Sequence, residues 1–368
     1  MNIGFFISSH GYGHATRCLG IVQKLADLKK INVSIFSRLP NWFIEENLNG
    51  ITFHNEQVTT DIGLVQKDPF NHDLSSTIEQ LEQFLKFDDP KIESIEKLLQ
   101  KKPFDLLICD ISPLGIYIGK KLGIPVCLVE NFTWDWIYEE YQAKNKQFKK
   151  PISVLKDIFN SADLHIQTNP ICEEKNDSFK VNPIFRPSRK NVNETRKSLS
   201  IHPDQKTILV TTGGIPQSYG FVEKIRADRE NFYILTGAYE SEYFDKNFCL
   251  LPHRNNFYFP DLVSAANCVV GKVGYGTVAE SWGAQKPLIG VYRHEFRESE
   301  PMKKFVDKNL AGFKISYESF SEGNWIEQVG QLISGFSDPS LSPKTNGRNQ
   351  VAEIILKWKT NNLDPTKP

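Results

Sequence analysis

Short apolar runs alternate with amphipathic stretches along the first half of the chain. The runs that we expect to form buried strands are Asn2–Ser8, Asn32–Ser37, Ile51–Asn55, Phe104–Cys109, Ile124–Val129 and Leu164–Gln167. Apolar positions recur at helical spacing in Ala15–Lys29, in Leu74–Gln100 with a break at Pro90, and in Leu114–Leu122. Strands that alternate with helices in this way predict βαβ units and a parallel sheet.

A second alternating set begins after the stretch Val181–Pro203, which is rich in proline and basic residues, and we place the interdomain linker at the start of this stretch. The strands expected in this half are Thr207–Thr212, Phe232–Thr236, Asn256–Phe259, Cys268–Val270 and Pro287–Val291. The helices expected there are Asp261–Ala266, Pro301–Lys308 and Arg348–Thr360. The predicted fold class is therefore α/β, with two Rossmann-like domains over residues 1–187 and 188–346 that face one another across a ligand-binding cleft.

Composition narrows the class of protein. The 368 residues include 44 Lys and Arg against 44 Asp and Glu, and this balance argues against a nucleic-acid-binding protein, which usually has a basic excess. No apolar run approaches the roughly 18 residues of a membrane span, and the first residues have the pattern of a strand and not of a signal peptide. The six cysteines are scattered, which indicates free thiols and a cytoplasmic protein.

A glycine turn follows the strand at Cys268–Val270. Gly274 and Gly276 lead into a helix that carries Thr277 and Glu280 in its first turns. Glycines let the backbone approach a phosphate, the first N–H groups of a helix point at it, and Glu280 is placed to accept hydrogen bonds from ribose hydroxyls. The alternative is a strand–turn–helix corner that binds no ligand.

A second glycine pair, Gly213-Gly214, also follows a predicted strand of this half. Two such turns at the strand ends of one sheet favour one extended anionic ligand, such as a nucleoside diphosphate, over two purely structural turns. The chain has no GxxxxGK[ST] motif, which disfavours a P-loop kinase. It also has no Asp-x-Asp pair, so we expect no metal and assign the phosphate charge to helix N-termini.

The first half offers a candidate general base. His14 lies on a glycine turn, with Gly11 and Gly13 before it, at the carboxyl end of the first strand. Histidine titrates near neutrality and is the usual proton acceptor in catalysis. Asp110 ends another strand and is expected to orient His14. The alternatives are a structural histidine, a helix-capping Asp110, and Asp61 as the partner of His14.

Two further groups have the chemistry of sugar binding. Trp134, Asp135 and Trp136 follow a strand, and aromatic rings beside carboxylates suit an acceptor sugar. The alternative is an amphipathic helix that packs its aromatic side chains into the core. Glu298 and Glu300 follow the strand Pro287–Val291 and are expected to accept hydrogen bonds from donor-sugar hydroxyls. The alternative for these two acids is a charged surface.

The chain resembles the two-domain GT-B glycosyltransferases, including the lipid-linked N-acetylglucosaminyltransferase of peptidoglycan synthesis. It is more similar to the glycosyltransferase-like N-terminal region of plant L-arabinokinases. The stretches that carry the resemblance are His10–Arg17 (HGYGHATR), Asp61–Gln66 (DIGLVQ), Asn131–Tyr141 (NFTWDWIYEEY), Gly271–Glu280 (GKVGYGTVAE) and Arg297–Pro301 (RESEP).

This resemblance implies a metal-independent, inverting glycosyltransferase without a cofactor. Its partners would be a sugar nucleotide, of uridine or a similar base, held by the second domain, and a hydroxyl acceptor held by the first. Residues 347–368 would form a helix that crosses back to the first domain. The family often has Asp and Gln where this chain has Glu298 and Glu300, so the donor sugar is not named. The alternatives are a nucleotide-sugar 2-epimerase or hydrolase, and a binding module without turnover.

Overall fold

The structure is a computed structural model that describes residues 1–65, 72–213, 219–237, 240–335 and 344–361. Its contacts divide the chain into two compact units. The first unit comprises Met1–Ile184, Phe296–Glu298 and Asn346–Pro368, and the second comprises Phe185–Glu295 and Ser299–Thr345. Gly214, which the sequence assigns to the phosphate site, lies outside the described residues.

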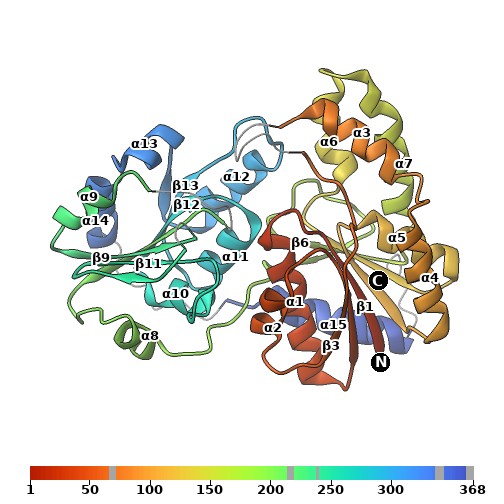
Figure 1. Cartoon of the computed structure of the whole chain (residues 1–368), viewed down its shortest axis with the longest axis horizontal. Coiled ribbons are helices and arrows are strands. Elements are labelled where there is room, and N and C mark those ends of the chain that lie inside the picture. Colours follow the sequence, from red (N-terminus) through yellow and green to blue (C-terminus); the bar gives the residue numbers. More distant parts are fainter. Residues whose placement is uncertain (66–71, 214–218, 238–239, 336–343, 362–368) are drawn as a thin grey trace. The chain divides into compact units, whose positions relative to one another are not determined.

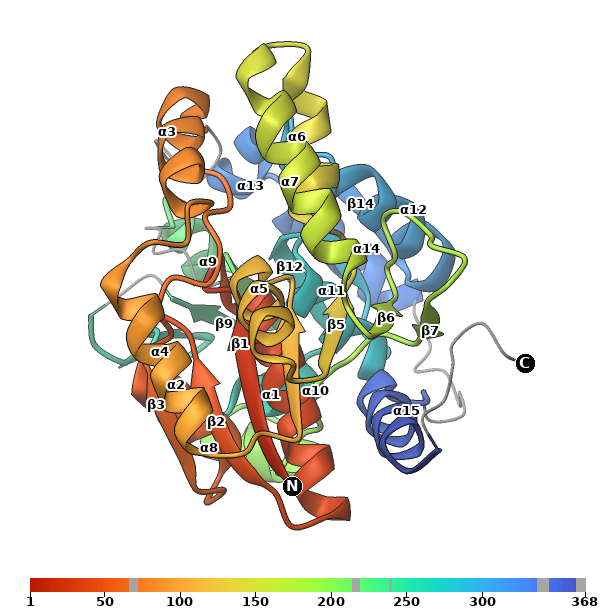
Figure 2. The same cartoon turned by 90° about the vertical axis from the view of Figure 1, so that its right-hand side faces the viewer.

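The first unit is built on a seven-stranded parallel sheet with the order β3-β2-β1-β4-β5-β6-β7. Its strands are β1 (Asn2–Ile7), β2 (Asn32–Phe36), β3 (Phe53–Glu56), β4 (Leu106–Asp110), β5 (Val126–Glu130), β6 (Leu164–Thr168) and β7 (Phe179–Val181). Figure 2 shows these strands in that order, from β3 on the left to β7 on the right. The central strands β4 and β5 are buried along their whole length, as expected for a parallel sheet that is covered on both faces.

Helices cover both faces of this sheet (Figure 1). One face carries α1 (Tyr12–Leu28), α2 (Asn41–Leu48) and α15 (Gly347–Asn361). The other carries α3 (Leu74–Phe84), α4 (Pro90–Lys101), α5 (Pro113–Leu122), α6 (Trp134–Gln142), the 3-10 turn η1 (Lys146–Phe148) and α7 (Lys149–Asn160). The last helix, α15, lies against α1 and β7 and buries Val351, Ala352 and Ile355 in the core of this unit.

The chain reverses its direction across the sheet between β1 and β4. It proceeds from β1 to β2 and β3 on one side, and then from β4 to β7 on the other. In open α/β sheets, ligands bind beyond the carboxyl ends of the strands at such a switch point. His14 follows β1 and Asp110 ends β4, so both predicted residues lie at this position.

The second unit repeats the doubly wound plan with the strand order β10-β11-β9-β8-β12-β13-β14. Its strands are β8 (Lys206–Thr211), β9 (Asn231–Thr236), β10 (Tyr243–Phe244), β11 (Phe248–Leu251), β12 (Cys268–Lys272), β13 (Leu288–Val291) and β14 (Gly312–Ile315), of which β10 alone is antiparallel to its neighbour. Its helices are α8 (Val192–Ser198), α9 (Val222–Ala227), α10 (Phe259–Ala265), α11 (Tyr275–Gly283), α12 (Ser299–Asn309), α13 (Tyr317–Glu322) and α14 (Ile326–Gly335).

The switch point of the second unit lies between β8 and β12. Gly213 follows β8 and Gly274 follows β12, so both described glycine turns lie at this edge. Gly271, on β12, has φ of 150°, and a Cβ there would lie 1.8 Å from the carbonyl oxygen of Thr211. Only glycine therefore allows β8 and β12 to come so close where the predicted phosphate loop begins.

Some expected elements differ from the structure. Asn256–Phe259, expected as a strand, forms none, because Phe259 begins α10 and Pro260 lies in its first turn, where a missing N–H costs nothing. The strand beside β9 is β11, formed by another short apolar run. Beyond the expected linker, the stretch Val181–Pro203 also contains α8, and Asn191 and Glu194 cap its N-terminus with a reciprocal capping box. Among the described residues, no helix is long and apolar enough to cross a membrane.

Candidate functional site

His14 lies in the first turn of α1, directly beyond β1. The turn that reaches it depends on Gly11, whose φ of 94° is strained for any residue with a side chain. Gly13 follows in the helix, where its carbonyl accepts a hydrogen bond from the Thr16 hydroxyl at 3.0 Å. The histidine is 7% exposed, so it is held by the protein on most sides.

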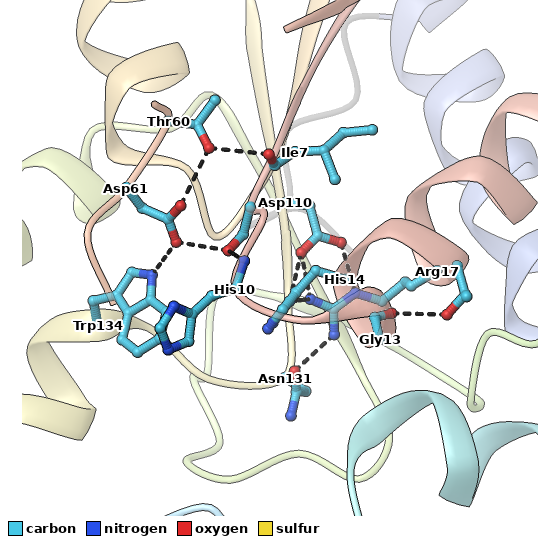
Figure 3. A network of polar contacts seen from close by, with 12 residues as sticks. Ile7, His10, Gly13, His14, Arg17, Thr60, Asp61, Asp110, Asn131 and Trp134 are labelled. Carbon is cyan, nitrogen blue, oxygen red and sulfur yellow. Dashed lines mark hydrogen bonds and ion pairs between the residues drawn. The ribbon is translucent and has the colours of Figure 1, made fainter. Parts of the chain in front are cut away.

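Asp110 and Arg17 both contact Nδ1 of the His14 ring (Figure 3). Nδ1 of His14 lies 3.0 Å from Oδ1 of Asp110, as the sequence predicts for an orienting carboxylate. Arg17 is one helical turn beyond His14 on α1, so both side chains lie on one face of the helix. Its Nε donates to Oδ2 of Asp110 at 2.7 Å, and its Nη2 donates to Oδ1 at 2.6 Å.

This pairing sets the charge state of Asp110. Burial by itself would raise the pKa of this fully buried carboxyl, but the charge and hydrogen bonds of Arg17, with a smaller contribution from His14, hold it below its usual value. Asp110 is therefore an anion near neutral pH. Capping of the next helix is not its role, because Ser112 accepts the hydrogen bond from Gly115 N at the start of α5.

The two neighbours of Nδ1 are compatible with different tautomers of His14. Nη2 of Arg17 lies 3.0 Å from Nδ1, and guanidinium nitrogens only donate. If Nδ1 accepts from Arg17, the proton of the neutral ring is on Nε2. If Nδ1 carries the proton and donates to Asp110, Nε2 is left free to accept one. Only this second tautomer provides a general base at Nε2.

The network continues from Arg17 to Glu298. Nη1 of Arg17 donates to Oδ1 of Asn131 at 2.7 Å, and Nδ2 of Asn131 donates to Oε1 of Glu298 at 2.9 Å. Glu298 is buried in the first unit, whereas Glu300 is exposed at the start of α12, 3.7 Å from Lys304. The two acids that the sequence treats as a pair therefore have different surroundings.

Asp61 forms a separate buried group next to this network (Figure 3). Its Oδ2 accepts from the Ser8 hydroxyl at 2.7 Å and from Nε1 of Trp134 at 2.6 Å, and its Oδ1 accepts from Thr60 at 3.2 Å. Burial raises the pKa of Asp61, although these hydrogen bonds and the nearby His14 lower it in part. The carboxylate that contacts His14 is thus Asp110 and not Asp61.

The aromatic stretch after β5 is largely core. Trp134 and Trp136 on α6 are both buried, and Arg297 stacks on the Trp136 ring with 4.1 Å between the guanidinium carbon and the ring centroid. Neither ring offers an open stacking surface, so the packing of α6 matches the amphipathic-helix alternative. Asp135 is also buried, which raises its pKa, and its Oδ1 has no hydrogen-bond partner among the described residues.

The second unit has an open glycine edge at its switch point. Gly274 is the N-cap of α11, and Gly276 and Thr277 lie in the first turn of this helix. A Cβ at Gly213 or Gly274 would meet no atom within 4 Å, so internal packing does not fill the space beside either residue. The free N–H groups of a helix start face such a space and suit an anion.

Glu280 is buried on α11 and is paired with Arg186. Nε of Arg186 lies 2.7 Å and Nη2 lies 2.6 Å from Oε1 of Glu280, so both contacts use the same carboxylate oxygen. Burial raises the pKa of Glu280, and Arg186 opposes that shift. The guanidinium carbon of Arg186 also lies 5.4 Å from the centroid of the Tyr258 ring.

Three residues of these two sites were not identified from the sequence as site residues, namely Arg17, Asn131 and Arg186. Arg17 had a signal, since it follows His14 at helical spacing. Asn131 directly follows β5, as catalytic residues often follow strands. Arg186 had none, because a linker arginine gives no indication of the distant acid that it will meet. Within the described ranges, no group of three or more His, Cys, Asp or Glu side chains is arranged to hold a metal ion.

The sequence of the chain is similar to part of one known plant kinase. No family model matches the sequence. The chain is similar to the L-arabinokinase of Arabidopsis thaliana, with 24% identity over 357 residues. The similarity covers 95% of this chain and 34% of the kinase, so the chain spans about a third of the length of that relative.

Solved glycosyltransferases have the same fold. The calicheamicin glycosyltransferase CalG4 matches with a TM-score of 0.65 at 13% identity, covering 98% of both chains. The glycosyltransferase of kitacinnamycin matches with a TM-score of 0.66 at 13% identity, covering 97% of this chain and 98% of the other. UGT2 of Phytolacca americana, solved with UDP-2fluoro-glucose and pterostilbene, matches with a TM-score of 0.61 at 12% identity, covering 97% of this chain and 99% of the other. The chain has the GT-B fold. The predicted fold class and the predicted resemblances to GT-B glycosyltransferases and to a plant L-arabinokinase are thus confirmed.

Proposed function

We propose that the protein is an inverting glycosyltransferase that moves a sugar from a nucleoside-diphosphate donor to an acceptor hydroxyl without a metal ion. The observation that carries the proposal is the contact of His14 with Asp110 at the switch point of the first unit of a GT-B fold. The similarity to a kinase that is named for a sugar substrate supports a sugar-modifying enzyme at a coarser level.

His14 is the proposed general base. The acceptor oxygen attacks the anomeric carbon while the bond from that carbon to the diphosphate oxygen breaks, and the hydroxyl proton passes to Nε2 of His14. Asp110 holds Nδ1–H and stabilises the imidazolium that results, as the third member of a catalytic triad does. Arg17 is a positioning residue, because it contacts Asp110 and Nδ1 of His14 and touches no reacting atom.

The second unit is the proposed donor site. The diphosphate lies against Gly213, Gly214, Gly274, Gly276 and Thr277, where N–H groups at the start of α11 stabilise the negative charge of the leaving group. Oε2 of Glu280 accepts from a ribose hydroxyl, since both Arg186 contacts go to Oε1. Glu298 and Glu300 are proposed to accept from hydroxyls of the donor sugar, and Gly11, Gly13, Asp61, Trp134, Asp135 and Trp136 to shape the acceptor side.

The test is a screen of nucleotide sugars against the full chain. Thermal shift identifies the donor, since a ligand at 100 times its dissociation constant stabilises the native state by about 2.7 kcal/mol. Chromatography of the reaction then separates the candidate activities. A new glycoside supports transfer, free sugar without acceptor dependence indicates a hydrolase, and an isomeric nucleotide sugar indicates a 2-epimerase. Binding without any product would contradict the proposal and leave a binding module.

A further inference from the structure

The first unit contains a cavity of about 400 Å³ that none of the predicted site residues lines. It lies between the carboxyl ends of β2 and β3 and the junction of α3 with α4. Its volume is in the range of small-molecule binding sites, which are roughly 300–1,000 Å³. The carboxyl ends of parallel strands share one edge of the sheet, so the cavity and the turn that carries His14 are on the same edge.

The loop after β3 joins the cavity to the candidate site. Val58 and Thr59 line the cavity, and the next two residues, Thr60 and Asp61, belong to the buried group beside His14. Consecutive Cα atoms are 3.8 Å apart, so Thr59 and Asp61 lie within about 7.6 Å. The cavity is therefore adjacent along the chain to the buried group of Asp61.

Internal contacts already occupy two of the charged side chains that line the cavity. Nζ of Lys91 lies 2.7 Å from Oε2 of Glu56. Oδ1 of Asp89 accepts from the backbone N of Lys91 at 2.7 Å and caps α4. Neither group offers its full charge to a ligand.

Besides the Thr59 hydroxyl, four polar groups remain available, and they are complementary in kind. Arg38 and Asp88 are exposed, and neither side chain has a hydrogen bond or ion pair with another described residue. Gln57 donates its amide to the Leu39 carbonyl at 3.1 Å, which leaves its oxygen. Gln83 accepts from Lys86 at 2.8 Å, which leaves its NH₂ group. The cavity thus presents a cationic and a neutral donor beside an anionic and a neutral acceptor.

Apart from Thr59, the remaining wall is apolar. Val58 and Ile92 are buried beneath the cavity, and the partly buried ring of Phe84 lines it. The hydroxyls of a sugar both donate and accept hydrogen bonds, whereas the C–H faces of its ring pack on apolar surfaces. A ligand with a single charge would face one of the two free side chains as a like charge, Asp88 for an anion and Arg38 for a cation. A neutral polyhydroxyl molecule uses all four polar groups without that repulsion.

We infer that this cavity binds a neutral carbohydrate portion of the acceptor. That the bound carbohydrate belongs to the acceptor rests on the proposed glycosyl transfer, but carbohydrate binding itself is measurable without turnover. Arg38, Asp88 and Gln83 would hold the hydroxyls, and Phe84 would lie against the C–H face.

The experiment uses saturation-transfer NMR on the full chain with methyl glycosides of glucose, galactose, mannose, xylose and arabinose, and with xylobiose and lactose. Glucuronate and glucosamine are the anionic and cationic probes. The variants are Arg38→Ala, Asp88→Ala and Gln83→Ala, with Arg229→Ala, an exposed arginine of the second unit, as the matched control. All four sites are exposed, and circular dichroism checks that each variant is folded.

We expect at least one neutral glycoside to bind the wild type and Arg229→Ala with equal affinity. Its affinity for Arg38→Ala and for Asp88→Ala should be lower by about tenfold or more, the scale of a lost charged hydrogen bond. No binding of any neutral probe, equal binding by all variants, or binding of a charged probe alone would overturn the inference.

Transfer assays separate this inference from the proposed function. If transfer occurs and Arg38→Ala leaves KM for the acceptor unchanged, the cavity is not the acceptor site although the enzyme is a transferase. If a glycoside binds in an Arg38-dependent way but no nucleotide sugar is consumed, the proposed function fails and the carbohydrate site stands.

Discussion

Arg17 donates to both carboxylate oxygens of Asp110, at 2.6 and 2.7 Å, from the same helix that carries His14. Asp110 therefore contacts two partners, His14 and Arg17, and Arg17 is the closer one. A carboxylate that only oriented a histidine would be replaceable by an amide with little effect on folding. Here the replacement also leaves a buried guanidinium without its counter-ion, which is costly.

Replacement of His14 by alanine is expected to lower turnover about 10²–10⁴-fold, the usual contribution of a general base. Affinity for the nucleotide should stay near the wild-type value, because the proposed phosphate contacts belong to the second unit. Single-turnover transfer and titration calorimetry measure the two effects, and His202→Ala, at an exposed histidine, is the control. Wild-type turnover in His14→Ala would mean that the base lies elsewhere, with Asp61 the next candidate.

Arg17 and Asp110 are expected to be strongly coupled in stability. Asp110→Asn and Arg17→Met should each cost about 3–5 kcal/mol in the free energy of unfolding, because each removes one partner of a buried ion pair. The double variant should lose clearly less than the two single losses together. Urea unfolding of the four proteins measures this, and losses that add to within about 0.5 kcal/mol would contradict the coupling.

Asp61 is expected to make stability fall as the pH rises. Its pKa in the folded protein is raised above the value of about 3.9 for an unfolded chain, so between these values the native state binds more protons than the unfolded state. The free energy of unfolding then decreases from about pH 4 upward through the folded pKa. In Asp61→Asn this contribution is absent, so the stability of the variant relative to the wild type should increase with pH over that window. A pH-independent difference between the two proteins, from urea unfolding at pH 3–8, would refute it.

The donor site gives a prediction about Glu280. Glu280→Ala should weaken binding of the nucleoside diphosphate by roughly 1.5–3 kcal/mol, the scale of a charge-assisted hydrogen bond. A chelator should leave affinity unchanged. Since the substitution also removes the ion pair of Glu280 with Arg186, Arg186→Lys is measured beside it, and Glu223→Ala, at an exposed acid, is the control. Unchanged nucleotide affinity in Glu280→Ala would show that Glu280 is not a ribose ligand. Strict dependence of binding on a divalent ion would contradict a metal-free site.

Glu298 and Glu300 form a natural pair of variants because they are two residues apart in sequence and differ in surroundings. Glu298→Ala should lower kcat/KM by about tenfold or more, the effect of about 1.4 kcal/mol, since its carboxylate is held in the His14 network by Asn131. Glu300→Ala should lower it by a smaller factor, since water weakens the hydrogen bond that an exposed acid makes to a sugar hydroxyl. Equal losses in steady-state kinetics would show that burial does not distinguish their roles.

The hydrophobic pattern by itself determined the α/β class, the two-domain plan and the glycine turns, because apolar periodicity and glycine spacing are local properties of the chain. It also placed His14 and Asp110 at strand ends, where the topology brings them together. It did not distinguish the strand at Phe248–Leu251 from the apolar run at Asn256–Phe259, because only the neighbouring strand decides which run pairs.

The tertiary structure alone decided which partners the charged groups have. Asp110 meets Arg17, Glu280 meets Arg186, and Glu298 meets Asn131 across separations of 93, 94 and 167 residues. A charge buried at a strand end must find a counter-charge or a hydrogen bond, yet local sequence does not specify which distant side chain supplies it. Burial likewise decided that Trp134 and Trp136 belong to the core, since the same amphipathic spacing is compatible with a packed helix and with an exposed binding surface.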